Sequence, residues 1–174
     1  YADYLEKIAF NVLPAQHNDD FTLRQYFQQA NQVKVSYAHH NFFDENDGRQ
    51  AFGLLTGYPC CTANMHQGYP KYVQNLWYAT ADEGVAALVY GSSEVTLTVR
   101  GGHTVSFSEE TNYPFEDKIR FRYNSTTTAE MPFHLRIPAW CKEAAITING
   151  KLEQQAKGNQ VIVINRKWQP GDVL

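Results

Sequence analysis

The sequence contains no apolar run long enough to span a bilayer, no cluster of basic residues and few cysteines. Its 174 residues carry 15 Lys and Arg against 18 Asp and Glu, a net charge of -3, with only three Cys. A membrane-spanning helix needs about 20 consecutive apolar residues, and nucleic-acid-binding domains usually present a basic patch. These absences exclude a membrane span, argue against a nucleic-acid partner and leave no basis for a disulfide framework.

Aromatic and hydrophobic residues are abundant instead. The chain has 11 Tyr, 10 Phe and 3 Trp, and 43% of its residues are hydrophobic. This content suits one large or two small domains with a real core, although the rings could equally line a sugar-binding cleft. The opening Tyr1-Ala2-Asp3-Tyr4 resembles neither a signal peptide nor a translation start, so we expect the chain to begin inside a longer protein.

Helical spacing of apolar residues predicts two helices in the first half of the chain. The first ends before Pro14 and carries an apolar stripe of Tyr1, Leu5, Ile8 and Val12. Residues 16–50 are polar and show little periodicity, which is typical of functional loops or of poorly ordered chain. The second helix is expected from about Thr62 to Ala79, with Pro70 as an interior residue that would kink or split it.

After Asp82-Glu83-Gly84 the hydrophobic period changes from helical to alternating. Alternation predicts half-buried antiparallel strands around residues 95–99, 119–123, 133–137 and 146–148. Asn149-Gly150 is a strong signal for a two-residue hairpin turn. We therefore expect an α+β chain, with a helical part at 1–81 and an antiparallel, jelly-roll-like β-sandwich at 82–174. Residues 171–174 resemble the entry to a further strand, so the sandwich is expected to be cut before its edge is complete.

The adjacent cysteines Cys60 and Cys61 lie where an extended run is expected to enter the second helix. Pro59 disfavours helix in the preceding residue and Thr62 could cap the helix, which would place both thiols at the positive end of the helix dipole. Such a position favours the thiolate, the form that attacks electrophiles and binds zinc. Two further interpretations stay open: a pair of small buried hydrophobic residues, or a strained vicinal disulfide.

Two cysteines cannot complete a zinc site, because structural sites take about four ligands and catalytic sites about three. The nearest histidines are His39, His40 and His66, but a histidine in a polar loop is usually simply solvated.

Acidic pairs occur at Glu109-Glu110 and at Glu116-Asp117. Glycosidases use a pair of carboxylates, but charges at strand ends commonly protect a sheet edge, and we interpret both pairs in this way. Cys141 follows a predicted strand beside Trp140 and is interpreted as a packing residue.

An ordered set of motifs resembles the β-L-arabinofuranosidase family of cysteine glycoside hydrolases, glycoside hydrolase family 127 and its relatives. In chain order the motifs are Gly57-Tyr58-Pro59-Cys60-Cys61-Thr62-Ala63-Asn64-Met65-His66-Gln67-Gly68, Asn75-Leu76-Trp77-Tyr78, Ala87-Leu88-Val89-Tyr90, Tyr113-Pro114, Leu135-Arg136-Ile137-Pro138-Ala139-Trp140-Cys141 and Trp168-Gln169-Pro170-Gly171-Asp172. The resemblance spans nearly the whole chain. It implies the last part of an (α/α)6 catalytic barrel followed by the first β-sandwich domain.

The resemblance also implies a catalytic role for the cysteine pair. Cys60 matches the family's nucleophile, which also binds zinc, and Cys61 matches a second ligand of the same zinc ion. The acid/base glutamate and the remaining ligands, a glutamate and another cysteine, are expected upstream of this chain. Zinc is therefore expected in the full-length enzyme, and absent or weakly bound in this chain alone.

The implied activity is retaining hydrolysis of L-arabinofuranosides or of related plant-polysaccharide sugars. Gln28 stands where the family usually has a tyrosine lining the sugar pocket, and Gln28, His39 and His66 are the candidate substrate-binding residues. The alternative is a non-catalytic carbohydrate-binding or structural β-sandwich module. We expect a carbohydrate partner, self-association through the apolar stripes around Ile8 and Leu76, and a periplasmic or extracellular location.

Overall fold

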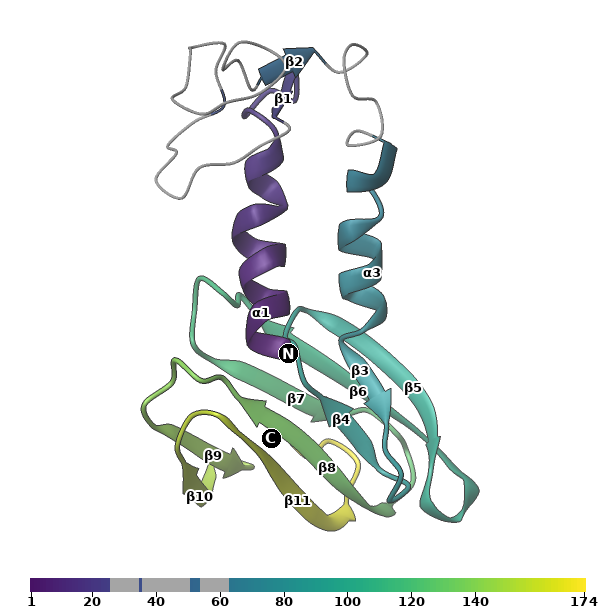
Figure 1. Ribbon diagram of the computed structural model, residues 1–174. Coiled ribbons are helices and arrows are strands. Elements are labelled where there is room, and N and C mark those ends of the chain that lie inside the picture. Colours follow the sequence, from purple (N-terminus) through teal and green to yellow (C-terminus); the bar gives the residue numbers. More distant parts are fainter. Residues whose placement is uncertain (26–34, 36–50, 54–62) are drawn as a thin grey trace. The chain divides into compact units, whose positions relative to one another are not determined.

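The computed structural model describes residues 1–25, 35, 51–53 and 63–174 (Figure 1). The chain is mixed α+β and divides into two compact units, one of residues 3–72 with Tyr1 and one of residues 73–174 with Ala2. The boundary between residues 81 and 82 rests on the change of hydrophobic period and stays a prediction. Within the described residues, no helix combines the length and the hydropathy that crossing a bilayer requires.

The first predicted helix is present, but its hydrogen-bond pattern changes along its length. The α-helix α1 (Ala2–Lys7) runs directly into a π-helical segment (Ile8–Val12), and a 3-10 turn (Pro14–Gln16) follows. The N–H of Leu13 donates to the carbonyl of Ile8 at 2.8 Å, the five-residue spacing of a π-helix. Proline is tolerated at the start of the next turn because no intrahelical N–H is needed there.

The apolar stripe of this helix is exposed. Leu5, Ile8 and Val12 retain 37%, 52% and 45% of their accessible surface, whereas Ala9 and even Glu6 are buried. This exposure agrees with the expectation that the stripe around Ile8 lacks covering neighbours in this chain. A pattern shows which face is suited to burial, but only the neighbouring elements decide which face is covered.

Helix α3 (Gly68–Gln74) packs against the first helical segment through its residues 68–72, which belong to the first unit. The rings of Phe10 and Tyr72 meet edge to face at 5.5 Å, and the side chain of Leu13 lies against Gly68. The earlier residue of the first segment, Phe10, contacts the later residue of α3, Tyr72, and the later residue, Leu13, contacts the earlier one, Gly68. The two helices therefore run antiparallel (Figure 1). The unit also contains the antiparallel strands β1 (Leu23–Gln25) and β2 (Ala51–Gly53).

The second predicted helix is shorter than its pattern suggested. Residues 63–65 are helical and α3 ends at Gln74, but Trp77 to Ala79 form strand β3. Aromatic residues favour strands, and β3 gains an antiparallel partner in β4 (Val85–Ala87) across a tight turn. Pro70 lies in the first turn of α3 and therefore does not break it. Leu76, expected to be an uncovered stripe residue, is instead 2% exposed.

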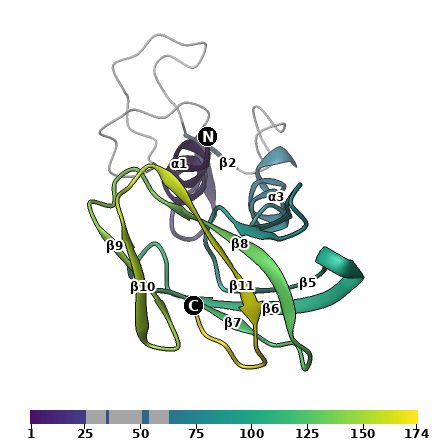
Figure 2. The ribbon, with the colours of Figure 1, turned by 90° about the horizontal axis from the view of Figure 1, so that it is seen from below.

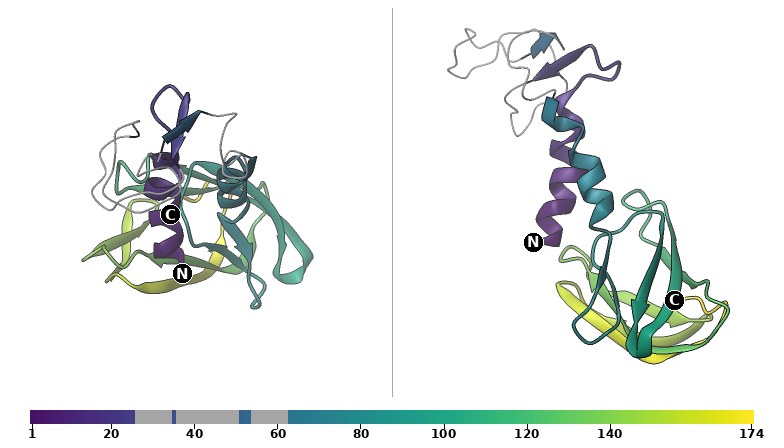
Figure 3. Two further views of the ribbon diagram at one scale, coloured as in Figure 1. Left: turned by 45° about the horizontal axis from the view of Figure 1, so that its top comes forward. Right: turned by 90° about the vertical axis from the view of Figure 1, so that its right-hand side faces the viewer.

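The second unit is a β-sandwich, as predicted. One sheet has the order β11-β8-β4-β3, the other has the order β5-β6-β7, and β9 and β10 form a separate hairpin. Figures 2 and 3 show the strands of this unit from further directions. The remaining strands are β5 (Ser93–Val99), β6 (His103–Thr111), β7 (Ile119–Tyr123), β8 (Ala129–Ile137), β9 (Ala144–Ile148), β10 (Lys151–Ala156) and β11 (Gln160–Trp168).

One strand pair departs from the antiparallel prediction, because β4 and β8 are parallel. Parallel neighbours need a long connection, and here strands β5, β6 and β7 lie between them in the chain. β8 also pairs antiparallel with β11 over the full length of both, from Gln160 opposite Ile137 to Trp168 opposite Ala129. Alternation alone could not distinguish these two modes of pairing.

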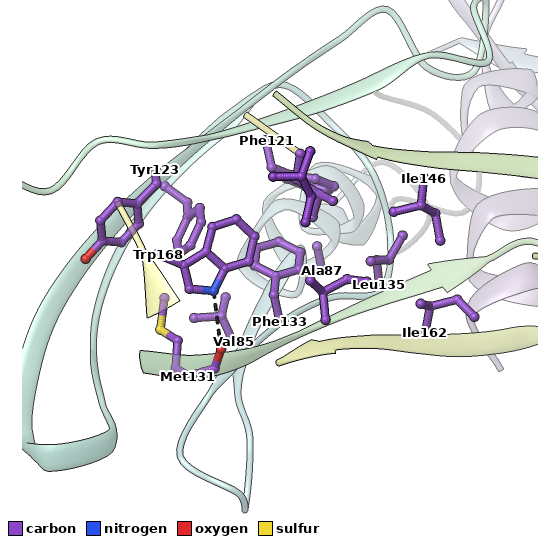
Figure 4. Packing of buried hydrophobic residues seen from close by; sticks show 14 of the residues in the cluster. Val85, Ala87, Phe121, Tyr123, Met131, Phe133, Leu135, Ile146, Ile162 and Trp168 are labelled. Atoms are coloured by element: carbon purple, nitrogen blue, oxygen red, sulfur yellow. Dashed lines mark hydrogen bonds between the residues drawn. The ribbon is translucent and has the colours of Figure 1, made fainter. Parts of the chain in front are cut away.

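Aromatic side chains fill the space between the sheets (Figure 4). The Phe107 ring meets those of Phe133 and Trp168 at centroid distances of 5.1 and 5.5 Å. Trp168 is fully buried, and its indole N–H donates to the Met131 carbonyl at 3.2 Å. The aromatic rings of this unit therefore mainly form its hydrophobic core. The only polar atom of the Trp168 side chain has a hydrogen-bond partner there.

The predicted hairpin turn is confirmed, and residues 171–174 pair with a strand as expected, while the predicted truncation of the sandwich edge stays a prediction. Asn149 and Gly150 both have positive φ, 51° and 78°, which a two-residue I′ hairpin turn requires. Residues 171–174 pair along the outer edge of β7, where Phe121 and Leu174 exchange both backbone hydrogen bonds at 2.8 and 2.9 Å.

We expect Gly84→Ala to destabilise the sandwich by about 2 kcal/mol or more. A Cβ at this position would overlap the backbone carbonyl of Pro132, which cannot move without disturbing β8. Gly91→Ala is the matched control, because its Cβ would meet the Leu76 methyls at an ordinary 3.6 Å. Urea unfolding midpoints measure both effects. Equal midpoints for the two variants would contradict the packing argument.

Candidate functional site

The sequence-predicted site lies mostly outside the described residues. Cys60, Cys61, Gln28 and His39 belong to this undescribed part, and their assignments stay predictions. The described chain resumes at residue 63 with a helical turn, where the N–H of Gln67 donates to the Asn64 carbonyl at 3.0 Å. Residues 63–65, which follow the cysteine pair closely in the sequence, are therefore helical. His66 lies in the turn before α3 and is exposed.

The thiolates of the cysteine pair are suitable zinc ligands, but two ligands are too few to form a zinc site. Thiolates are soft ligands that zinc prefers, and a protein zinc site takes three or four ligands. Among the described residues, no three His, Cys, Asp or Glu side chains come close enough together to hold a metal ion. Further ligands would have to come from elsewhere.

Glu109 is a titratable residue whose setting the sequence interpretation missed. It lies on β6, the central strand of its sheet, and is 2% exposed rather than placed at a protective sheet edge. The backbone N–H of Gly91 donates to its Oε1 at 3.0 Å, while Oε2 is buried without a hydrogen-bond partner among the described residues. Burial raises the pKa of Glu109 to about 8. The sequence did contain a signal for this burial. Alternation along the strand places Glu109 on the same inward face as Val105 and Phe107.

The other acidic residues at this end of the sandwich behave as solvated charges. Glu110 is exposed and pairs with Arg120 at 3.3 Å, and Glu116 accepts a hydrogen bond from the Asn112 amide at 3.0 Å. A protonated carboxylic acid is what general acid catalysis needs, but Oε2 of Glu109 is sealed from solvent. Substrate could not reach it, so Glu109 is a buried structural acid in this fold.

Cys141 packs against the edge of the core, as its sequence setting predicts. Its thiol donates to the Glu143 carbonyl at 3.3 Å. Nothing in this contact activates the sulfur as a nucleophile.

Comparisons with known proteins find a family match for the second half of the chain and solved structures of similar fold for nearly all of it. A family model described as the middle domain of β-L-arabinofuranosidases of glycoside hydrolase family 127 matches residues 84–174. Ara127N, a GH127 β-L-arabinofuranosidase from Geobacillus stearothermophilus T6, is 24% identical with a TM-score of 0.78, over 99% of this chain and 27% of its own. A second solved structure, described as a glycoside hydrolase, is 22% identical with a TM-score of 0.79, over 99% and 28%.

The GH127 β-arabinofuranosidase BT3674 is 20% identical with a TM-score of 0.68, again over 99% of this chain and 28% of its own. No curated protein matches. At these identities the solved structures establish a shared fold, and this chain spans little more than a quarter of their length. The family model, however, matches more than half of the 174 residues. The chain therefore belongs to the β-L-arabinofuranosidases of glycoside hydrolase family 127, whose middle domain forms most of its second unit.

Proposed function

We propose that this chain is part of a retaining glycoside hydrolase acting on L-arabinofuranosides or on related plant-polysaccharide sugars. The family match at residues 84–174 carries the proposal, and the Cys60-Cys61 motif precedes that match in the order the family resemblance implies. Two of the structural neighbours are named as arabinofuranosidases, which supports the sugar class.

Residues 1–81 would then be the last part of an (α/α)6 barrel. The antiparallel packing of α3 against the first helical segment supports this assignment, because such a barrel is built from helical hairpins. The exposed stripe of Leu5, Ile8 and Val12 would face further barrel helices in a longer protein. In the isolated chain the same stripe would favour self-association.

Cys60 is the proposed nucleophile. Its thiolate would attack the anomeric carbon while a carboxylic acid outside this chain protonates the departing glycosidic oxygen. Water, deprotonated by that same group, would then displace the sulfur and release the sugar. Two inversions at one carbon give net retention. Zinc held by Cys60, Cys61 and ligands outside this chain would keep the thiol deprotonated.

Three further residues are proposed to contact the sugar: Gln28, His39 and His66. An amide or an imidazole can donate to or accept from a sugar hydroxyl, and the exposure of His66 leaves its ring available. Degradation of plant polysaccharides would place the longer protein in the periplasm or outside the cell.

The test of this function uses the longer protein. Its zinc content is measured together with its activity on aryl L-arabinofuranosides and, as controls, on aryl L-arabinopyranosides and D-xylosides. We expect about one zinc per chain, selective cleavage of a furanoside and an initial product with the substrate's anomeric configuration. Inversion, or a fully active zinc-free enzyme, would contradict the mechanism.

The alternative is a carbohydrate-binding or structural module, and one observation favours it. The second unit is compact and encloses its own aromatic core, as an independent module would. A longer protein that binds arabinan but cleaves none of the furanosides would support this alternative.

We expect Cys61→Ala in the longer protein to lower zinc content and kcat together, because loss of one ligand weakens a metal site by about tenfold or more. Metal analysis after dialysis and initial rates measure the two quantities. Added zinc should partly restore the rate of this variant. A variant that keeps both its zinc and its activity would remove Cys61 from the ligand set.

A further inference from the structure

The sandwich has a hollow of about 540 Å³ bordered by β7, the end of β8 and β9. Ligand pockets usually measure about 300–1,000 Å³ and combine an apolar lining with a few polar groups. Phe121, Leu135 and Ile146 give this hollow an apolar lining. Figure 4 shows these three side chains within the buried hydrophobic cluster. All the lining residues belong to the second unit. We call this hollow the Trp140 pocket.

Trp140 gives the pocket an exposed aromatic wall. Its side chain is 59% exposed, and its ring lies nearly parallel to that of Tyr113, at 19° and 6.3 Å between centroids. Tyr113 in turn meets the buried Tyr90 edge to face at 5.7 Å. The Tyr90 hydroxyl donates to the backbone carbonyl of Arg136, which anchors this series of rings to β8. The wall is therefore backed by the core.

Polar groups of both signs line the same pocket. Asp117 and Lys118 precede β7, and Glu143 precedes β9; all three are exposed. The guanidinium of Arg136 lies 5.7 Å from the centre of the Tyr90 ring, and its Nε donates to the Leu88 carbonyl. Mixed charge offers no net attraction for an anion or a cation. It does offer strong donors and acceptors for hydroxyl groups beside an apolar surface.

A sugar ring combines these two properties, since it has an apolar face of C–H groups and a rim of hydroxyls. We propose that the Trp140 pocket binds one sugar residue of a neutral glycan, with the ring face against Trp140 and hydroxyls bonded to Asp117 and Lys118. The choice of an arabinose-containing glycan rests on the proposed function. The pocket would hold a substrate chain through the sandwich and takes no part in bond cleavage.

Indole signals in ¹H–¹⁵N NMR spectra test this proposal without any measurement of hydrolysis. The chain has three tryptophans. The indole N–H groups of Trp77 and Trp168 are bonded to Ser93 at 3.0 Å and to Met131 at 3.2 Å. Adding L-arabinose or an α-1,5-arabino-oligosaccharide should shift the Trp140 signal alone. For a ligand of this size we expect dissociation constants of about 0.1–10 mM.

Trp140→Ala should weaken binding of the oligosaccharide, measured by calorimetry, by about tenfold or more, and Asp117→Ala should weaken it severalfold. Phe115→Ala is the control, because this aromatic side chain is 92% exposed but does not line the pocket. A Trp140 signal that no sugar moves, or binding unchanged in Trp140→Ala, would overturn the proposal. It would also be overturned if Trp140 became buried on self-association, because a protein segment would then be the occupant. Hydrolysis can fail while binding persists, so the two proposals are tested separately.

Discussion

Replacing Cys60 with serine in the longer protein is expected to abolish hydrolysis of aryl L-arabinofuranosides, with a loss in kcat of at least about 10⁴-fold. A serine hydroxyl is hardly ionised at neutral pH, and it is a harder and weaker ligand for zinc than a thiolate. Initial rates measure the loss. Mass spectrometry of the wild-type protein, quenched during turnover, should find the sugar attached to the peptide that contains Cys60.

Cys141→Ser is the matched control for this experiment, because it makes the same chemical change at a cysteine that packs against the core edge and bonds only to a backbone carbonyl, that of Glu143. We expect it to cost about 1 kcal/mol of stability and to leave the rate nearly unchanged. Wild-type turnover in Cys60→Ser would refute the nucleophile assignment. A well-folded but inactive Cys141→Ser protein would show that the catalytic role has been assigned to the wrong cysteine.

The second large effect is expected at Glu109, where stability should depend on pH. In the unfolded chain this carboxyl ionises near its ordinary pKa of 4.5, whereas in the folded chain burial raises the pKa to about 8. Between these values the folded protein keeps a proton that the unfolded chain has released. Stability should therefore fall as pH rises from about 4.5 to about 8, by a few kcal/mol in total, and stay level above that range.

Glu109→Gln should remove this slope. The amide oxygen can still accept from the Gly91 N–H, and its NH₂ group would occupy the position of Oε2, where the protonated acid also has no partner. The variant should match the wild type near pH 4 and exceed its stability by a few kcal/mol near pH 9. Urea unfolding across this range measures the difference.

Glu110→Gln is the control for the pH experiment, because Glu110 is a solvated neighbour paired with Arg120 at the surface. Surface ion pairs contribute about 0–1 kcal/mol, so this variant should keep the wild-type slope. A wild-type slope in Glu109→Gln would show that other groups set the pH dependence.

The sequence by itself determined the features that depend on neighbouring residues. Period-two alternation located β5, β7 and β8 because successive side chains of a strand point to opposite faces. Asn149-Gly150 determined its own hairpin turn, since these residues tolerate positive φ. The Cys60-Cys61 motif and its ordered companions were likewise readable as a family pattern, and the match at residues 84–174 confirms that family.

Only the tertiary structure decided what depends on distant partners. Trp77 became a strand residue because β4 offered it a pairing edge, and β4 became parallel to β8 because three strands lie between them in the chain. Glu109 has the same charge as Glu110 in the sequence, but the pleat turns one into the core and the other into solvent. Burial is a property of the elements that cover a residue. Local pattern can therefore indicate a suitable face, while packing across the chain determines the face that is buried and the pKa that follows from it.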